Sequence, residues 1–270
     1  VSADREITVH DLLTHPSGLG SGTAGASAMA KEPPRPGEDL ATIVPRWARA
    51  PLDFQPGSRW AYSPIAGFDT LGRIVEIASG QDLERFLTER IYEPLGMTST
   101  TFAPSPAQRE RMATLYTRKG GGLEKTPDQG GFIDPACFHG AAGLVGTAED
   151  YWRFGQMLAN GGELDGERVL SPRAVELLGS AQTPTGVPGL PPGYAYGLGV
   201  IVVTDGAEAK TPLTTGSFGW SGAFGTHFWV DPAKKLVAVY MANKTTAGGA
   251  GAASARDFEK AVMQSLAAPE

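Results

Sequence analysis

The hydrophobic positions follow two different patterns along the chain. Before the Pro/Gly-rich stretch 183–193, apolar residues mostly recur at the three- and four-residue spacing of amphipathic helices. After it, they form short strand-like runs, followed by an amphipathic segment at 252–266. Helices first, then antiparallel strands, then a closing helix are typical of an α+β fold.

The clearest predicted helix follows Tyr62. Ser63 suits an N-cap, Pro64 suits the first helical position, and Gly80 supplies a C-terminal stop. The apolar face of this helix is expected to consist of Ile65, Phe68, Leu71, Ile74, Val75 and Ala78.

Other segments carry weaker helix and loop signals. Further helices are expected at 7–13, 39–50, 82–91 and 147–161, and others are expected to start at 105 and at 171. Surface loops are expected at 20–38, 118–131 and 183–193, where Gly, Ala and Pro gather.

Strands are expected at 196–203, 226–230 and 236–241. The last two are separated by the turn 231–235 and predict a β-hairpin. Just before them, the stretch 216–226 places one tryptophan, Trp220, among glycines and other small residues. Glycine lets a backbone approach a ligand closely, so an edge strand built this way can offer N–H groups to an oxyanion.

Composition excludes several classes of function. A net charge of −6 over 270 residues argues against nucleic-acid and anionic-membrane partners, and no apolar run reaches the length of a membrane span. Cys137 is the single cysteine, and the four histidines lack metal-site spacing, so neither a metal nor another cofactor is expected. The first residues carry neither an initiator methionine nor a signal-peptide pattern. We interpret the N-terminus as an internal start, and the sequence does not indicate a cellular compartment.

A series of short blocks points to a known family. They are 7–19 (ITVHDLLTHPSGL), 56–63 (PGSRWAYS), 143–150 (GLVGTAED), 161–172, 196–199 (YGLG) and 220–222 (WSG). In this order they resemble the serine β-lactamase/penicillin-binding-protein superfamily, nearest its class C and family VIII carboxylesterase branch. The resemblance implies a β-lactamase-like fold, an antiparallel sheet flanked by helices plus a mainly helical domain. Residues 1–19 and 196–270 would form the sheet domain, without its N-terminal part, and 20–195 the helical domain, with a cleft between them.

The resemblance also implies roles for particular residues. Tyr62 matches the tyrosine that shares the general-base role, and Ala223 would give the N–H that helps form the oxyanion hole. Trp220, Ser221 and Gly222 match the strand that borders the substrate. Trp220 replaces the usual lysine and Pro64 the usual asparagine, which favours uncharged esters as small-molecule substrates.

The family's nucleophile motif, Ser-x-x-Lys, is absent from the sequence. None of the eight lysines has a serine or threonine three positions earlier. Because the motif precedes the 7–19 block in the family, the nucleophile is expected outside this chain, in an N-terminal companion segment. No metal or cofactor is required by the implied acyl-enzyme mechanism.

Other interpretations stay open. A β-lactamase or D-Ala-D-Ala carboxypeptidase-like enzyme is the runner-up, and a non-catalytic fragment or ligand-binding homologue is the third. His15 is expected to stabilise a turn, and His227 to be structural. Cys137 and His139 are interpreted as structural rather than as cleft residues. Ser221 is not expected to be a nucleophile, because no Lys or His is adjacent in sequence.

Overall fold

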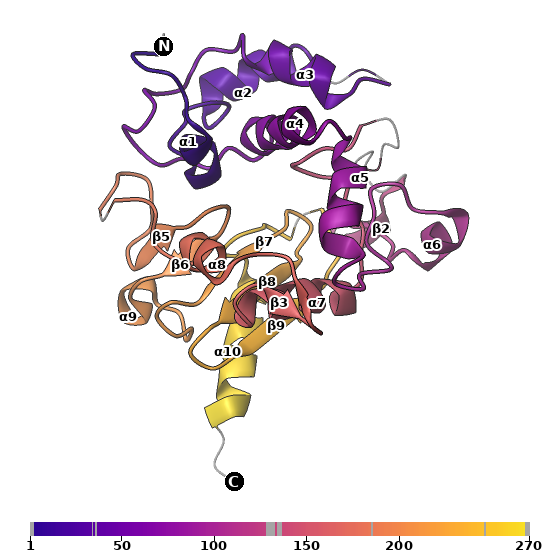
Figure 1. Cartoon of the computed structure of the whole chain (residues 1–270), viewed down its shortest axis with the longest axis vertical. Helices are drawn as coiled ribbons and strands as arrows, with labels where there is room; N and C mark the ends of the chain where they lie inside the picture. Colours follow the sequence, from indigo (N-terminus) through magenta and orange to yellow (C-terminus); the bar gives the residue numbers. More distant parts are fainter. Residues whose placement is uncertain are drawn as a thin grey trace.

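The computed structural model describes residues 3–267 except 34, 36, 128–132, 134–136, 185 and 246. Parts of the predicted loops 20–38, 118–131 and 183–193 therefore lie outside the described residues. The helices are α1 (Val9–Thr14), α2 (Thr23–Ala30), α3 (Leu40–Trp47), α4 (Ala66–Ser79), α5 (Leu83–Leu87), the π-helix η1 (Thr88–Tyr92), α6 (Pro106–Arg111), α7 (Ala148–Ala159), α8 (Pro172–Leu178), α9 (Gly206–Ala209) and α10 (Ala253–Ala267). Figure 1 shows α1 to α4 gathered at one end of the molecule and α10 at the other.

The strands form one larger sheet and two small hairpins in the described part of the chain. The small hairpins pair β1 (Tyr116–Lys119) with β2 (Gly122–Lys125) and β3 (Glu163–Leu164) with β4 (Glu167–Arg168). The larger sheet is antiparallel, in the order β5 (Tyr194–Tyr196), β6 (Ile201–Val203), β7 (Phe218–Ser221), β8 (His227–Asp231) and β9 (Leu236–Tyr240). The α+β prediction is confirmed.

Both faces of this sheet are packed against helices. On one face Phe228 and Val230 join the core formed with Met157 and Leu158 of α7. On the other face Trp229 packs with side chains that include those of α10. The predicted hairpin is confirmed as β8 and β9, and the predicted closing helix as α10.

Two expectations about strands are wrong. The predicted strand 196–203 is two strands, because the chain turns between them and Gly199 adopts φ +82°. The strand that carries Trp220 is central rather than an edge strand, since β7 pairs with both β6 and β8. Its pairing with β6, however, reaches only to Gly219, so the end of β7 has a partner on one side.

A helix, α2, lies inside the predicted loop 20–38. Its N-terminus is held by the carboxylate of Asp53, which accepts hydrogen bonds from the N–H groups of Gly22, Ala24 and Gly25 at 2.8–3.0 Å. A cap from such a distant residue leaves no local signal, which explains the missed helix. Similarly, the hairpin of β1 and β2 occupies part of the predicted loop 118–131.

The helix after Tyr62 differs in detail from the prediction. It begins at Ala66. Ser63, which lies before the helix, accepts a hydrogen bond from the Gly67 N–H through its hydroxyl oxygen. Its fully buried positions are small or polar, and Ile65 is exposed instead of facing the core. Gly80 ends the helix in the left-handed conformation, as predicted. The predicted helix 82–91 is α5 continued by the π-helix η1.

Candidate active site

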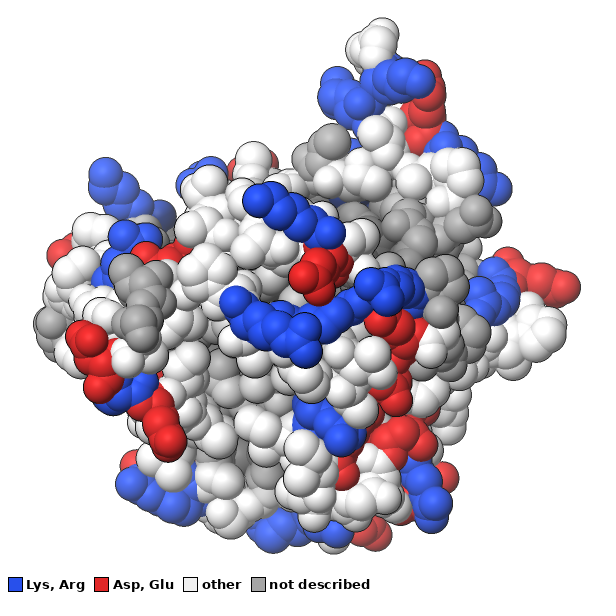
Figure 2. Space-filling model, turned by 90° about the horizontal axis from the view of Figure 1, so that it is seen from above, with Lys and Arg blue, Asp and Glu red and all other residues white. Residues whose placement is uncertain are grey.

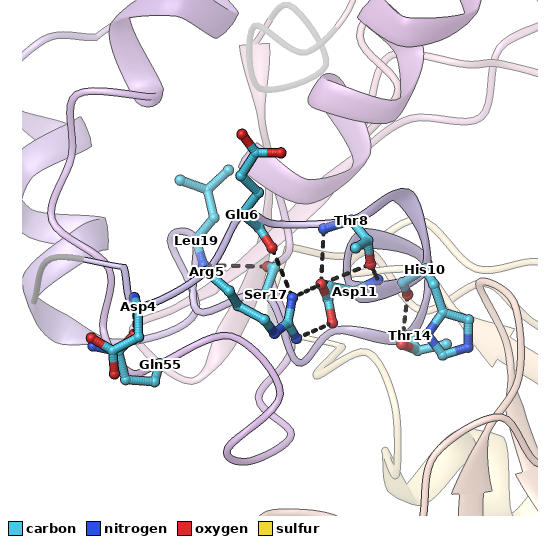
Figure 3. Close-up of polar contacts among 10 residues, drawn as sticks. All are labelled: Asp4, Arg5, Glu6, Thr8, His10, Asp11, Thr14, Ser17, Leu19 and Gln55. Atoms are coloured by element: carbon cyan, nitrogen blue, oxygen red, sulfur yellow. Dashed lines mark hydrogen bonds and ion pairs between the residues drawn. The ribbon is translucent and has the colours of Figure 1, made fainter.

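A rigid N-terminal turn leads into the candidate site. The Arg5 guanidinium binds both carboxylate oxygens of Asp11, at 2.6 and 2.9 Å, and Thr8 and Asp11 cap α1 reciprocally (Figure 3). Burial by itself raises the pKa of Asp11, but the hydrogen bonds from Arg5 and Thr8 outweigh it and lower the pKa to about 2. The start of α1 is thereby fixed, and the helix ends at His15 in the left-handed conformation.

His15 occupies the centre of the site region and is completely buried. Its Nδ1 accepts the backbone N–H of Ser63 at 3.4 Å, and its Nε2 lies 3.2 Å from the Tyr196 hydroxyl. With Nδ1 as the acceptor, the neutral ring carries its proton on Nε2 and donates to Tyr196. Burial lowers the pKa of His15 to about 4, so the ring is neutral near pH 7. These contacts confirm a structural role at the turn.

Aromatic side chains surround this imidazole. Ring centroids within 6.3 Å of that of His15 belong to Trp60, Tyr62, Phe68 and Tyr196. Trp220 of β7 completes the cluster through contacts with Tyr62 and Tyr196, with centroids 5.0 and 5.4 Å away. Segments far apart in sequence therefore meet around one buried ring.

Tyr62 and Trp220, two residues singled out from the sequence, are in direct contact. The Trp220 indole N–H donates to the Tyr62 hydroxyl oxygen at 3.0 Å. Burial raises the pKa of Tyr62, while the bond from Trp220 opposes this rise. Among the described residues, no Lys or Arg contributes to the pKa shift of this phenol. Tyr62 would therefore need a cation from elsewhere to act as a base near neutral pH.

The backbone after Trp220 presents a free donor. Gly222 donates to the Thr226 carbonyl, so the N–H of Ser221 points away from β8, and Ala223 follows in the turn that the Gly225 N–H closes on the Gly222 carbonyl. On that side the pairing with β6 has already ended at Gly219. Ala223 is exposed, and its N–H has no partner within the described residues. Such a donor suits an oxyanion.

Ser221 has a partner that its sequence neighbours do not reveal. The Ser221 hydroxyl oxygen lies 2.8 Å from Nδ1 of His227, which faces it across the β7–β8 hairpin. Ser221 has no histidine next to it in sequence, but His227 lies beside it in the folded chain. A hairpin register that pairs residues 221 and 227 would have predicted this contact, because directly opposed residues share one face of the sheet.

His139 is held by a buried carboxylate. Asp69 of α4 is wholly buried and accepts bonds from Nδ1 of His139 and from the Ala141 N–H, both at 2.9 Å. The hydrogen bond with Asp69, supported by one with Cys137, raises the pKa of His139 to about 10. This pair joins the segment before Ala141 to α4, in agreement with a structural role. Sequence reasoning missed Asp69, since it looked for apolar residues on this helix.

Other kinds of site find little support in the described residues. No cluster of three or more His, Cys, Asp or Glu side chains with metal-binding geometry occurs among them. Nor does any helix in the described part of the chain have the length and apolarity to cross a membrane. On the face seen in Figure 2, basic side chains lie beside acidic ones, so this face has no extended patch of one sign.

Comparison with known proteins places the chain in a family. Residues 1–261 match the Beta-lactamase family. The chain belongs to this family. As a Beta-lactamase family member, it falls in the serine hydrolase superfamily predicted from the sequence blocks, and the predicted β-lactamase-like fold is confirmed.

Several curated relatives match most of the chain. An uncharacterised protein of Mycobacterium tuberculosis is 36% identical over 253 residues, which cover 88% of this chain and 63% of the relative. Esterase EstB of Burkholderia gladioli is 31% identical over 271 residues, covering 91% of this chain and 67% of EstB. The chain thus spans about two thirds of the length of these family members.

Solved structures agree on the fold. EstCE1, described as a hydrolase with promiscuous acyltransferase activity, superposes with a TM-score of 0.82 at 24% sequence identity. The match covers 95% of this chain and 72% of EstCE1. At this identity the likeness shows a shared Beta-lactamase-type fold.

Proposed function

We propose that this protein is a serine hydrolase that cleaves carboxylic esters through an acyl-enzyme. The observation that carries the proposal is the contact of Tyr62 with Trp220, which precedes by three residues the N–H of Ala223, a donor without a partner among the described residues. An indole, rather than a lysine, borders the phenol, so the described site lacks the cation that would hold a substrate carboxylate. Esterase EstB is a family relative.

In the proposed reaction the nucleophile is the serine of a Ser-x-x-Lys motif outside these 270 residues. Its oxygen attacks the ester carbonyl, while its proton passes to the motif's lysine and Tyr62. The oxyanion accepts the Ala223 N–H, and the alcohol leaves with a proton returned from the same groups. Water then attacks the acyl-enzyme and releases the acid. No metal or cofactor takes part in this scheme.

The proposed cleft lies between two lobes, residues 20–195 and residues 1–19 with 196–270. Tyr62 comes from the first lobe and Trp220 from the second, so their contact would lie at the boundary between the two lobes. Trp220, Ser221 and Gly222 would line the substrate on the sheet side. These lobe boundaries stay a prediction.

The test compares turnover of p-nitrophenyl butyrate with that of the β-lactam nitrocefin by the full-length protein. We expect the ester to be the better substrate and Tyr62→Phe to lower kcat by at least about a hundredfold, as is typical for loss of a general base. Tyr116→Phe, at an exposed tyrosine, is the matched control. Faster nitrocefin turnover would favour a β-lactamase or carboxypeptidase-like enzyme instead.

A second measurement separates catalysis from binding alone. Intact mass after treatment with a fluorophosphonate should show one adduct on the full-length protein. Absence of any adduct, together with no ester turnover, would favour the non-catalytic, ligand-binding alternative.

A further inference from the structure

The N–H of Ala223, the donor in the proposed oxyanion contact, belongs to a peptide group whose other end is held. That peptide group joins Gly222 to Ala223, and the Gly222 carbonyl accepts the Gly225 N–H at 3.0 Å. In a planar trans peptide the carbonyl and the N–H point in opposite directions. The bond from Gly225 therefore points the Ala223 N–H out of the turn 222–225.

The chain after β9 packs against this turn. The Lys244 N–H donates to the Phe224 carbonyl at 2.9 Å. Gly225 adopts φ +99°, and a Cβ at this position would lie 2.7 Å from the Cβ of Ala247 and 3.3 Å from that of Ala242. Only a glycine allows this close approach of the two segments. The position of the turn therefore depends on where the chain after β9 lies.

The hairpin of β1 and β2 holds the chain after β9 from its other side. Tyr116 takes part through its backbone: its N–H donates to the Asn243 carbonyl at 3.1 Å, and its carbonyl accepts the Thr245 N–H at 2.9 Å. Tyr116 and Lys244 thus form a parallel bridge. Because the N–H groups of an extended chain alternate sides, that of Lys244 faces Phe224 instead of the hairpin.

Three threonine hydroxyls reinforce this junction. Oγ1 of Thr117 lies 2.8 Å from Oγ1 of Thr245 and 2.7 Å from Oγ1 of Thr126. All three residues are partly buried, so water competes less for these contacts. The Thr126 N–H donates to the carbonyl of Leu115, which is completely buried. Thr117 therefore links a hairpin rooted in the interior to the chain after β9.

We propose that Thr117 is a positioning residue that, through Thr245, holds the turn and aims the Ala223 N–H at the oxyanion. This inference rests on the proposed function, in which Ala223 supplies that donor. A donor oriented in advance stabilises the developing charge without reorganisation during the reaction. A turn that could shift would lose this advantage in the transition state more than in the bound substrate.

Replacing the carbonyl oxygen of the substrate by sulfur gives a test specific for the oxyanion. Sulfur is a weak hydrogen-bond acceptor, so a thionoester gains less than an ester from the same N–H. Thr117→Val in the full-length protein keeps the shape of the side chain but removes its hydroxyl. We expect kcat for p-nitrophenyl butyrate to fall about tenfold, with KM within about twofold, because a misaimed oxyanion donor costs less than a deleted one. The ratio of kcat/KM for this ester to that for O-p-nitrophenyl thionobutyrate should fall about threefold.

Matched variants separate positioning from a general loss of stability. Thr245→Val, at the other end of the contact, should lower the ratio as Thr117→Val does, whereas Thr117→Ser keeps the hydroxyl and should restore it. Thr211→Val removes a half-buried hydroxyl that donates to Glu259 of α10, and should leave the ratio unchanged. An unchanged ratio in Thr117→Val, or an equal fall in Thr211→Val, would overturn the proposal.

Amide hydrogen exchange tests the same link without turnover. In Thr117→Val the amide of Lys244 should exchange about tenfold faster, the scale of one hydrogen bond, while the amides of β8 keep their wild-type rates. Unchanged exchange at Lys244 would overturn the proposal. If the wild-type protein turns over no ester, the proposed function fails, while this exchange still decides whether Thr117 holds the turn.

Discussion

The Nε2 of His15 lies 3.2 Å from the Tyr196 hydroxyl oxygen, inside a set of aromatic rings that excludes water from the imidazole. This relationship joins the end of α1 to β5 at the point where Tyr62 is held. The ring acts as a neutral spacer, because a charge there would be desolvated without a counter-ion.

The burial of His15 predicts a loss of stability in acid. Its pKa is about 4 in the folded protein, below the ordinary 6.5, so the unfolded chain binds the proton more readily. The free energy of unfolding should therefore fall between pH 6.5 and pH 4, by up to about 3 kcal/mol from this group. Urea unfolding at several pH values measures this, and His15→Gln should flatten the acid dependence. An equally steep dependence in that variant would contradict the prediction.

The raised pKa of His139 predicts a loss of stability at alkaline pH. Its pKa is raised to about 10, first by the hydrogen bond with Asp69, so the folded protein holds the proton more tightly than the unfolded chain. The stabilisation should be complete below pH 6.5 and lost as pH rises through about 10. Thermal unfolding followed from pH 7 to pH 10 should show a falling Tm in the wild type and a flatter curve in His139→Gln. His10→Gln, at an exposed histidine, is the control.

The indole of Trp220 should support the reaction through Tyr62. Trp220→Phe keeps an aromatic ring but removes the N–H donated to the phenol oxygen. We expect kcat/KM for p-nitrophenyl butyrate to fall by about five- to tenfold, the value of one hydrogen bond that is stronger to a charged phenolate. Trp152→Phe, at an exposed tryptophan of α7, should leave it unchanged. A similar loss in both variants would show a general packing effect.

The cap of α2 should depend on Asp53. Three N–H groups converge on this carboxylate, so Asp53→Asn removes charge-assisted bonds that Asn replaces only in part. We expect a loss of about 1–3 kcal/mol in the free energy of unfolding and faster amide hydrogen exchange in α2. Glu32→Gln, at an exposed residue just after the helix, should change neither the free energy of unfolding nor the hydrogen exchange of α2. Unchanged exchange at Gly25 in Asp53→Asn would refute the role of the cap.

Local signals predicted the elements that depend on nearby residues. The hairpin of β8 and β9 and the helix α10 followed from periodicity and turn chemistry. Tyr62 and Trp220 could be singled out as site residues only because the sequence blocks resembled a family with a known fold. The helix α2 was missed because its cap comes from Asp53, and the split of 196–203 was missed although Gly197 and Gly199 signalled a turn.

The site details that sequence reasoning missed depend on tertiary contacts. The distance from Ser221 to His227 follows from strand register, which short polar and glycine-rich stretches leave open. Likewise, Asp69 lies outside the apolar face that the pattern assigned to its helix, and only the approach of His139 explains a buried carboxylate there.

Trp220 and Ser221 are consecutive residues of β7 and therefore point to opposite faces of the sheet, which limits how the chain can change in length. Removing or adding one residue before Trp220 within β7 would exchange the two faces, turning the indole toward α10 and the hydroxyl toward Tyr62. Both the contact of Trp220 with the Tyr62 phenol and the contact of Ser221 with His227 would be lost in one step. Insertions and deletions among natural variants of this protein should therefore avoid 218–221 and gather in connections such as 183–193, where length carries no such penalty.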